Sequence, residues 1–470
     1  MKKEPFLRGQ DSRNRDVVRV KPDRLALPPV RHAHAGLLVI TLIMVCFGLV
    51  MLFSASMTDA YSSEGNALFY VLKQGSITTM GLILALFIAM ILPVGLFDHF
   101  WMTVALYALT SALLAYVRFF GLVINSARRW VVIGGIQFQP SELAKIALVF
   151  CFAGYCSMVR RQRKAGKLRF KTPLRQFLAD GWIDILLPGM LLAVWILVIA
   201  FQPHLSFAVI MSFILVVLFL TAGIRLRSWL SAFSQLLVLV LIVVIAGSLV
   251  LGVLPAGELK TSLNETIESN FAHVAKRLDT FINPESASSD DRHQIRQSLI
   301  AIGSGGLTGV GLGRGRQKYN YLPEAHNDFV FAIIGEELGF MGAAAIVILF
   351  LLFMLMGISI TRNAANTFCA LLAGGYTMLI SIQAFLNIGV ATETLPTTGI
   401  SLPFFSYGGT SNLFFLVAIG FILAVSRTGQ RLSGVASPEH ATRPVQSDED
   451  AQRHSYLRSL AQENQMAGDS

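Results

Sequence analysis

Residues 36–57 read GLLVITLIMVCFGLVMLFSASM, a stretch without a single charged side chain. A helix rises about 1.5 Å per residue, so about 20 such residues cross the hydrocarbon core of a bilayer. Similar stretches recur along the chain, and we expect about ten transmembrane helices. The predicted spans are 36–57, 76–94, 102–117, 143–158, 185–201, 205–222, 236–254, 329–360, 369–390 and 411–425.

The composition agrees with these spans. Of the 470 residues, 54% are hydrophobic and 14% are charged, whereas a soluble domain has about 25% charged residues. The predicted class is an all-α integral membrane protein. We expect a basic cytoplasmic tail at 1–35, a ten-helix membrane domain at 36–426 and a disordered cytoplasmic tail at 427–470. A large extracytoplasmic loop, 255–327, should connect helices 7 and 8.

The positive charges predict the orientation. The net charge is +10, and basic residues gather before Gly36 and between Arg160 and Arg175, next to apolar spans. Cytoplasmic loops carry such an excess of Lys and Arg. Both termini should therefore face the cytoplasm, and the charge favours contact with membrane lipids over nucleic acid. The four cysteines lie in apolar segments, so no metal site is predicted.

A first candidate site lies between spans three and four. Adjacent Arg128 and Arg129 could bind phosphate oxygens by paired hydrogen bonds, or they could anchor the chain at the membrane interface. Pro140 should open the next helix. Lys145 then falls about one turn into a span, where Glu142 is its natural partner.

Two further segments are polar and rich in glycine. The run 303–313 lacks the lysine of a nucleotide-binding loop. It fits either a backbone that approaches lipid head groups or a flexible re-entrant hairpin. The stretch 395–411, with Ser406, predicts a re-entrant loop facing a polar cavity.

Ionisable residues gather where the eighth span begins. At helical spacing His326 and Glu337 share a face, and Asp328 and Glu336 could look toward the same cavity. A structural polar network is the alternative. The span at 329–360 is too long for one simple helix, so we expect either a bend at Gly339 and Gly342 or first turns that stand in a polar cavity.

Three sequence patterns occur together and in order. They are Arg128-Arg129-Trp130 with Gln139-Pro140-Ser141-Glu142, Asp328-Phe329 with Glu336-Glu337-Leu338-Gly339, and Leu402-Pro403-Phe404 with Ser406-Tyr407-Gly408-Gly409. Jointly they resemble the shape, elongation, division and sporulation (SEDS) family of peptidoglycan polymerases, which includes FtsW, RodA and SpoVE. The segment 323–329 is most similar to the FtsW and SpoVE branch.

The resemblance implies a peptidoglycan glycosyltransferase in the bacterial cytoplasmic membrane. It would polymerise lipid II into β-1,4 glycan strands outside the membrane, in cell division or septum synthesis, and release undecaprenyl pyrophosphate. Class B penicillin-binding proteins and other divisome proteins are the implied partners. No cofactor is required by the resemblance, although a divalent cation, Mg²⁺ or Mn²⁺, is compatible with the pyrophosphate.

The resemblance also implies site residues. Cations that could bind the pyrophosphate, and polar groups that could complete the substrate site, are Lys73, Arg128, Arg129, Lys145, His326, Asp328, Glu336 and Ser406.

One departure concerns the catalytic base. In ungapped register the family's catalytic aspartate falls on Ala287. The substitute candidates are Glu285, Asp290 and Asp291. Two other functions therefore stay open: a lipid II flippase, and a catalytically silent scaffold for a class B penicillin-binding protein.

Overall fold

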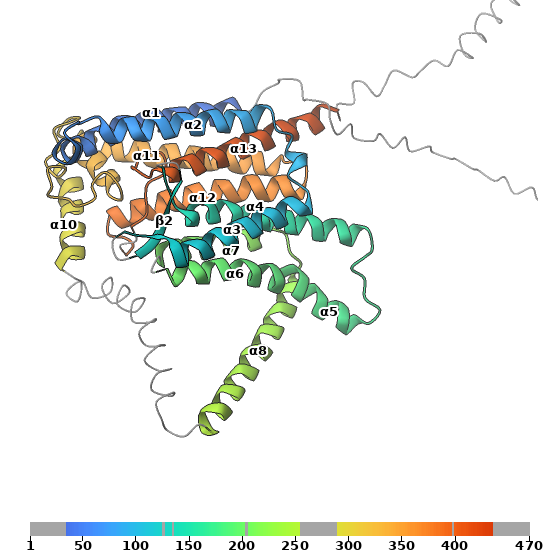
Figure 1. Cartoon of the computed structure of the whole chain (residues 1–470). Helices are drawn as coiled ribbons and strands as arrows, with labels where there is room; N and C mark the ends of the chain where they lie inside the picture. Colours follow the sequence, from blue (N-terminus) through green and yellow to red (C-terminus); the bar gives the residue numbers. More distant parts are fainter. Residues whose placement is uncertain are drawn as a thin grey trace, which may run out of the picture.

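The computed structural model describes residues 34–124, 127–133, 136–202, 205–253, 289–396 and 399–435, and Figure 1 shows their arrangement. Each of the ten predicted spans overlaps a helix. These helices are α1 (Ala35–Glu64), α2 (Phe69–Met90), α3 (Phe100–Phe120), α4 (Pro140–Lys164), α6 (Leu187–Ala200), α7 (Leu205–Thr221), α8 (Leu226–Val253), α11 (Val330–Arg362), α12 (Thr367–Ala391) and α13 (Thr410–Val435).

Length and composition support a membrane protein. Within the described residues, nine helical stretches are long and apolar enough to cross a membrane, and α7 is a shorter apolar helix. The predicted all-α membrane class is confirmed. The tails before residue 34 and after residue 435, and the part of the predicted outer loop from 254 to 288, lie outside the described residues.

Both ends of the described chain lie at the same end of the helix bundle (Figure 1). The backbone N–H of His34 donates to Ser426 Oγ at 3.2 Å, which ties the start of α1 to α13. An even number of spans requires this arrangement, as the sequence predicted.

Helix α4 lies at the centre of the bundle. Its residues from Ala144 to Ala153 are all buried. Phe150 of α4 meets Phe97, Phe368 and Phe421 edge to face. Since lipid tails are as apolar as these side chains, such close packing, rather than exclusion from water, holds membrane helices together.

The connections around the predicted spans have structure of their own. Between α3 and α4, three strands form a small antiparallel sheet in the order β1 (Leu122–Ile124), β2 (Ala127–Ile133) and β3 (Ile136–Phe138). Antiparallel pairing of β2 with β1 and with β3 lets the strands satisfy one another's backbone groups. The fifth span starts earlier than predicted, because α5 (Pro173–Gly181) and a π-turn (Trp182–Leu186, η2) lead directly into α6.

Helix α11 is broken at Gly339, as one of the two sequence alternatives predicted. Gly339 has φ 65° and ψ −164°, which is not helical. A break inside a membrane span leaves backbone groups without helical partners, and these need others. The glycine-rich run supplies them: the N–H groups of Val310 and Gly311 donate to the carbonyls of Glu336 and Glu337.

We call the pairing of residues 306–311 with the break in α11 the clasp. Its other two hydrogen bonds run from α11 to the glycine-rich run. The N–H of Phe340 donates to Gly306 O at 2.8 Å, and the N–H of Met341 donates to Leu307 O at 3.1 Å. The run is preceded by the surface helix α10 (Ser289–Ser304). The glycines of the run 303–313 allow its backbone to contact the backbone of α11. The run is therefore a structural partner of α11 and not a flexible hairpin.

Two buried carboxylates reinforce this clasp. Glu336 accepts hydrogen bonds from the backbone N–H groups of Arg316, at 2.7 Å, and of Gln317. Glu337 pairs with Lys318 Nζ at 2.7 Å, and both side chains are completely buried. Ser54 of α1 donates to Glu337 at 2.6 Å. The segment 313–318 is therefore fixed to α11 and α1 by charge.

Replacing Gly309 tests the clasp. A Cβ atom there would overlap the carbonyl of Glu337. Gly309→Ala should lower the thermal unfolding temperature of the detergent-solubilised protein by more than positive φ alone explains, because overpacking adds about 1–3 kcal/mol.

Gly313→Ala is the matched control. Gly309 and Gly313 both have φ +80°, but open space surrounds the Cβ position of Gly313. The control should show only the strain of a left-handed residue, about 1–2 kcal/mol. Equal losses in the two variants would contradict the clasp.

Candidate functional site

A polar cavity of about 330 Å³ opens at the end of the bundle where α4 begins. Segments far apart in sequence line it: the first turns of α2, strand β2, the start of α4, residues 327–328 and the loop 399–411. The cavity brings together Lys73, Arg129, Glu142 and Asp328, with Trp130, Gln139, Ser401, Tyr407 and Ser411 among the other lining residues.

An ion pair lies beneath this cavity. Lys145 Nζ is 2.8 Å from Glu142 Oε2, and both side chains are buried, so the partner predicted from the spacing is confirmed. Gln383 of α12 accepts a hydrogen bond from Lys145 at 2.7 Å. The ammonium group also lies over the rings of Phe207, at 4.4 Å, and Phe415. The buried ammonium group of Lys145 thus has a carboxylate, an amide oxygen and two aromatic rings as partners.

Asp328 is positioned by its backbone. Asn387 of α12 donates to the carbonyl of Asp328 at 2.7 Å and to the carbonyl of Ile400 at 2.6 Å. One amide therefore holds residue 328 and the loop 399–411 together. No hydrogen bond or ion pair joins the Asp328 carboxylate to another described residue. Burial, with a smaller effect from the charge of Glu324, raises the pKa of Asp328 to about 7.

His326 lies beside the cavity and outside helix α11. Since α11 begins at Val330, the predicted helical face shared with Glu337 is wrong. The imidazole stacks on Tyr70, with ring centroids 5.0 Å apart, and lies 3.9 Å from Asp59. Burial lowers the pKa of His326, and the charges of Asp59 and Glu324 oppose this shift.

Four of the predicted site residues do not line the cavity: Lys145, His326, Glu336 and Ser406. Glu336 belongs to the clasp on α11. Ser406 is buried, and its Oγ accepts a hydrogen bond from the N–H of Leu402 at 2.8 Å, which closes the turn 402–406. Both organise the segments around the site.

Other predicted residues are described only in part. Arg128 lies in β2, and Asp290 and Asp291 lie in the first turn of α10, but their side chains are not among those described. Glu285 and Ala287 lie outside the described residues. Among the described residues, no group of three or more His, Cys, Asp or Glu could hold a metal ion.

Nearly the whole membrane part of the chain matches one known protein family. Residues 35–431 match the family model described as "Cell cycle protein", which covers FtsW, RodA and SpoVE. The chain belongs to the FtsW/RodA/SpoVE family. The resemblance found in its sequence patterns is thereby confirmed.

Relatives of this family member span nearly its whole membrane part. It is 32% identical over 403 residues to a probable peptidoglycan glycosyltransferase FtsW of Geobacter metallireducens, covering 86% of this chain and 97% of that one. It is 32% identical over 402 residues to stage V sporulation protein E of Bacillus subtilis, covering 83% and 95%.

Solved structures share the fold. A chain of a peptidoglycan synthase complex that coordinates polymerization and crosslinking superposes with a TM-score of 0.56 at 23% identity, covering 86% of this chain and 99% of that one. The rod shape determining protein RodA of Thermus thermophilus gives 0.53 at 24% identity, covering 86% and 98%.

Sequence reasoning missed two polar residues in the core of this FtsW/RodA/SpoVE family member. Gln383 holds Lys145 and donates to Ser401 O at 3.1 Å, and Lys318 neutralises Glu337. The available signal for Gln383 was an amide in the middle of an apolar span, which is costly unless it has partners.

A double-mutant cycle tests the ion pair beneath the cavity. Lys145→Met should destabilise the protein by about 3–5 kcal/mol, because Glu142 is left buried without its partner. Glu142→Gln should also destabilise it. Glu142→Gln/Lys145→Met should be less destabilised than the sum of the two single changes, as measured by thermal unfolding in detergent. Additive losses would mean that the two side chains act separately.

Proposed function

We propose that this chain is a peptidoglycan glycosyltransferase that polymerises lipid II. The observation that carries the proposal is the cavity at the start of α4, where Lys73, Arg129 and Asp328 meet. The names of the relatives support it, since the Geobacter metallireducens protein is a probable peptidoglycan glycosyltransferase FtsW.

The membrane geometry of the proposal follows from charge. The protein is a multi-pass membrane protein. The Lys164 end of α4 carries Arg160, Arg161, Arg163 and Lys164, so the positive-inside rule assigns that end to the cytoplasm. The cavity then opens outside a bacterial cytoplasmic membrane, and both termini face inward.

The cations of the cavity suit a pyrophosphate. Lys73 supplies a point charge, and Arg129 can offer paired N–H donors to phosphate oxygens. Negative charge develops on the leaving pyrophosphate as the bond between C1 and its phosphate oxygen breaks, and fixed donors stabilise that charge. Arg128, the neighbour of Arg129 on β2, is proposed to assist.

Proton transfer requires a carboxylate near the acceptor sugar. The 4-hydroxyl of the acceptor attacks C1 of the donor, the new bond forms, and undecaprenyl pyrophosphate leaves. We propose that the carboxylate of Asp328 accepts the proton of the 4-hydroxyl. Its carboxylate lies in the cavity without a described partner, and a pKa of about 7 matches a base that works near neutral pH. A carboxylate is a poor direct ligand for a pyrophosphate, which favours this role over substrate binding.

A partner outside the membrane is part of the proposal. One structural relative is a chain of a complex that combines polymerization with crosslinking. A class B penicillin-binding protein is the proposed partner here, since it would crosslink the strands that this chain makes.

A transporter is the second candidate. A polar pocket also lies at the opposite end of α4, lined by Arg160, Arg163 and Arg225, and alternating access needs polar sites at both faces.

An assay of the purified protein and its partner in liposomes with lipid II separates the functions. Glycan polymer supports the enzyme. Exchange of lipid II between leaflets without polymer supports the transporter. The absence of both polymer and exchange supports a scaffold.

Loss of the arginines tests phosphate recognition. Arg129→Ala should reduce kcat/KM for lipid II about tenfold to a hundredfold, because charge-assisted hydrogen bonds contribute about 1.5–3 kcal/mol. Arg129→Lys should recover little, because an ammonium cannot form the paired bonds. Arg118→Ala is the control, since Arg118 lies at the end of α3 near the sheet and outside the cavity lining. Full recovery by lysine would contradict this role.

The pH profile tests the base. A base works only when deprotonated, so the polymerisation rate should fall about tenfold per pH unit below pH 7 and level off above it. Asp328→Asn should lower the rate about 10²–10⁴-fold and abolish this limb. A result in which Asp328→Asn keeps both the wild-type rate and the fall below pH 7, while Glu285→Gln, Asp290→Asn or Asp291→Asn loses activity, would contradict the assignment. It would place the base in the first turn of α10 or just before it.

A further inference from the structure

A second pocket, of about 310 Å³, lies at the Lys164 end of α4 and takes no part in the proposed glycosyl transfer. It is formed by the last turns of α4, the π-turn before α6 and the turn between α7 and α8. Four cations line it, Arg160, Arg163, Lys164 and Arg225, with Asp184 as the lining carboxylate. Glu142 and Arg163 are 21 residues apart on α4, so this pocket and the candidate site are separated by about 30 Å along the helix.

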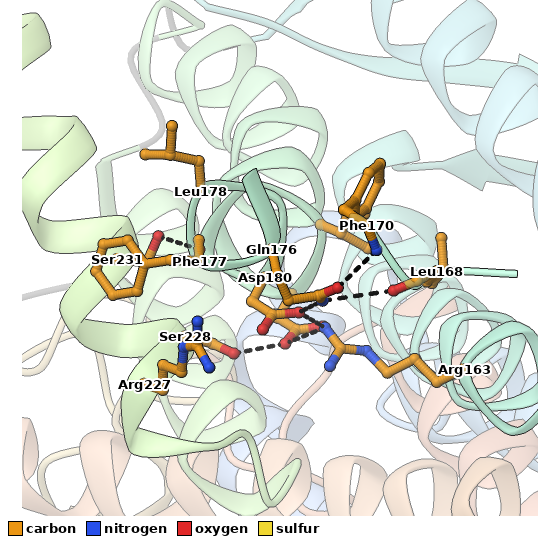
Figure 2. Close-up of polar contacts among 12 residues, drawn as sticks. Arg163, Leu168, Phe170, Gln176, Phe177, Leu178, Asp180, Arg227, Ser228 and Ser231 are labelled. Carbon is orange, nitrogen blue, oxygen red and sulfur yellow. Dashed lines mark hydrogen bonds and ion pairs between the residues drawn. The ribbon is translucent and has the colours of Figure 1, made fainter. Parts of the chain in front are cut away.

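One wall of the pocket is held in place by a partly buried polar network. Figure 2 shows Arg163 of α4 reaching toward Asp180 of α5, next to Ser228 of α8. Arg163 Nη2 lies 2.9 Å from Asp180 and 2.8 Å from Asp184, and Ser228 donates to Asp184 at 2.7 Å. The network joins three helices and sets two carboxylates against one guanidinium, so Arg163 shapes the wall and the network adds no positive charge to the pocket.

Arg160 forms another edge of the pocket. Its guanidinium donates to Thr367 Oγ1 at 2.8 Å and to the carbonyl of Ala222 at 2.6 Å. These bonds use two of the five N–H donors of an arginine. They fix the side chain between α4, α12 and the end of α7 without neutralising its charge.

The remaining two cations have no counter-ion among the described residues. No hydrogen bond or ion pair joins the charged groups of Lys164 and Arg225 to another described side chain, and both residues are exposed. Arg225 also immediately precedes α8, where the first N–H groups of a helix and its dipole favour an anion. The pocket mouth therefore carries uncompensated positive charge.

The pocket is amphipathic. Its mouth is cationic, while Val159 and Ala222 deeper in the lining are apolar and buried. We propose that this pocket binds the phosphate head group of an anionic glycerophospholipid from the adjacent leaflet. The cations hold the phosphate, and the apolar lining receives the glycerol backbone and the start of an acyl chain.

The geometry favours this ligand over two others that share phosphate chemistry. A free phosphate would leave the apolar lining without a partner. Lipid II at this end of α4 would serve a transporter, because the proposed glycosyl transfer takes place at the other end of the helix, about 30 Å away.

Native mass spectrometry of the detergent-solubilised full-length protein tests the proposal. Wild type, Lys164→Gln/Arg225→Gln and Arg169→Gln/Lys171→Gln are titrated with phosphatidylglycerol, phosphatidylethanolamine, undecaprenyl phosphate and inorganic phosphate. The second double variant removes the same charge from the same face, but neither Arg169 nor Lys171 lines the pocket.

We expect wild type to retain phosphatidylglycerol in preference to the zwitterionic lipid. Binding should weaken about tenfold in Lys164→Gln/Arg225→Gln, because each basic side chain at an anionic surface contributes to affinity, and should stay unchanged in the control. Equal losses of binding in the two double variants would mean that the lipid responds to general surface charge and not to this pocket. Equal binding of inorganic phosphate, or preference for undecaprenyl phosphate, would also overturn the proposal, and the latter would favour the transporter.

Discussion

Four backbone hydrogen bonds across the break in α11 are the constraint on which the cavity end of the helix bundle depends. Gly339 interrupts the helix, and the carbonyls and N–H groups on either side pair with residues 306–311. Inside a membrane such groups cannot turn to water, so the break and the glycine-rich run must form together. The segment 313–318 then has a defined path, and Lys318 reaches Glu337 in a dry interior.

The candidate site depends on that path. Residues 322–328 connect the clasp to the start of α11, and Asp328 enters the cavity one residue before Phe329. Asn387 then fixes residue 328 against Ile400, and Gln74 of α2 holds the loop at Gly409. Buried polar side chains thus substitute for the regular backbone bonding that this irregular region lacks. Each of them lies where a loop meets a helix, which positions the cavity without a large sheet or domain.

Local rules predicted what local spacing determines. Apolar runs identified the spans, the i, i+3 spacing identified Glu142 as the partner of Lys145, and the excess length of the eighth span pointed to the break at Gly339. The rest depends on pairs far apart in the chain. Gln383 is 238 positions from Lys145, and Ser54 is 283 from Glu337. Helical periodicity carries no information about such partners, and it failed for His326 because residues 326–329 are not helical.

The position of the base has a consequence for regulation. The resemblance to the family implied a catalytic aspartate at position 287, which is Ala here, in the segment between α8 and α10. A base in such a segment can be aligned by a partner that docks outside. Asp328 instead is attached to α12 through Asn387, so its place is set by the membrane bundle itself. If Asp328 takes the proton, an outer partner acts on this chain mainly through substrate access and delivery of the acceptor strand, because the base is already in position before the partner binds.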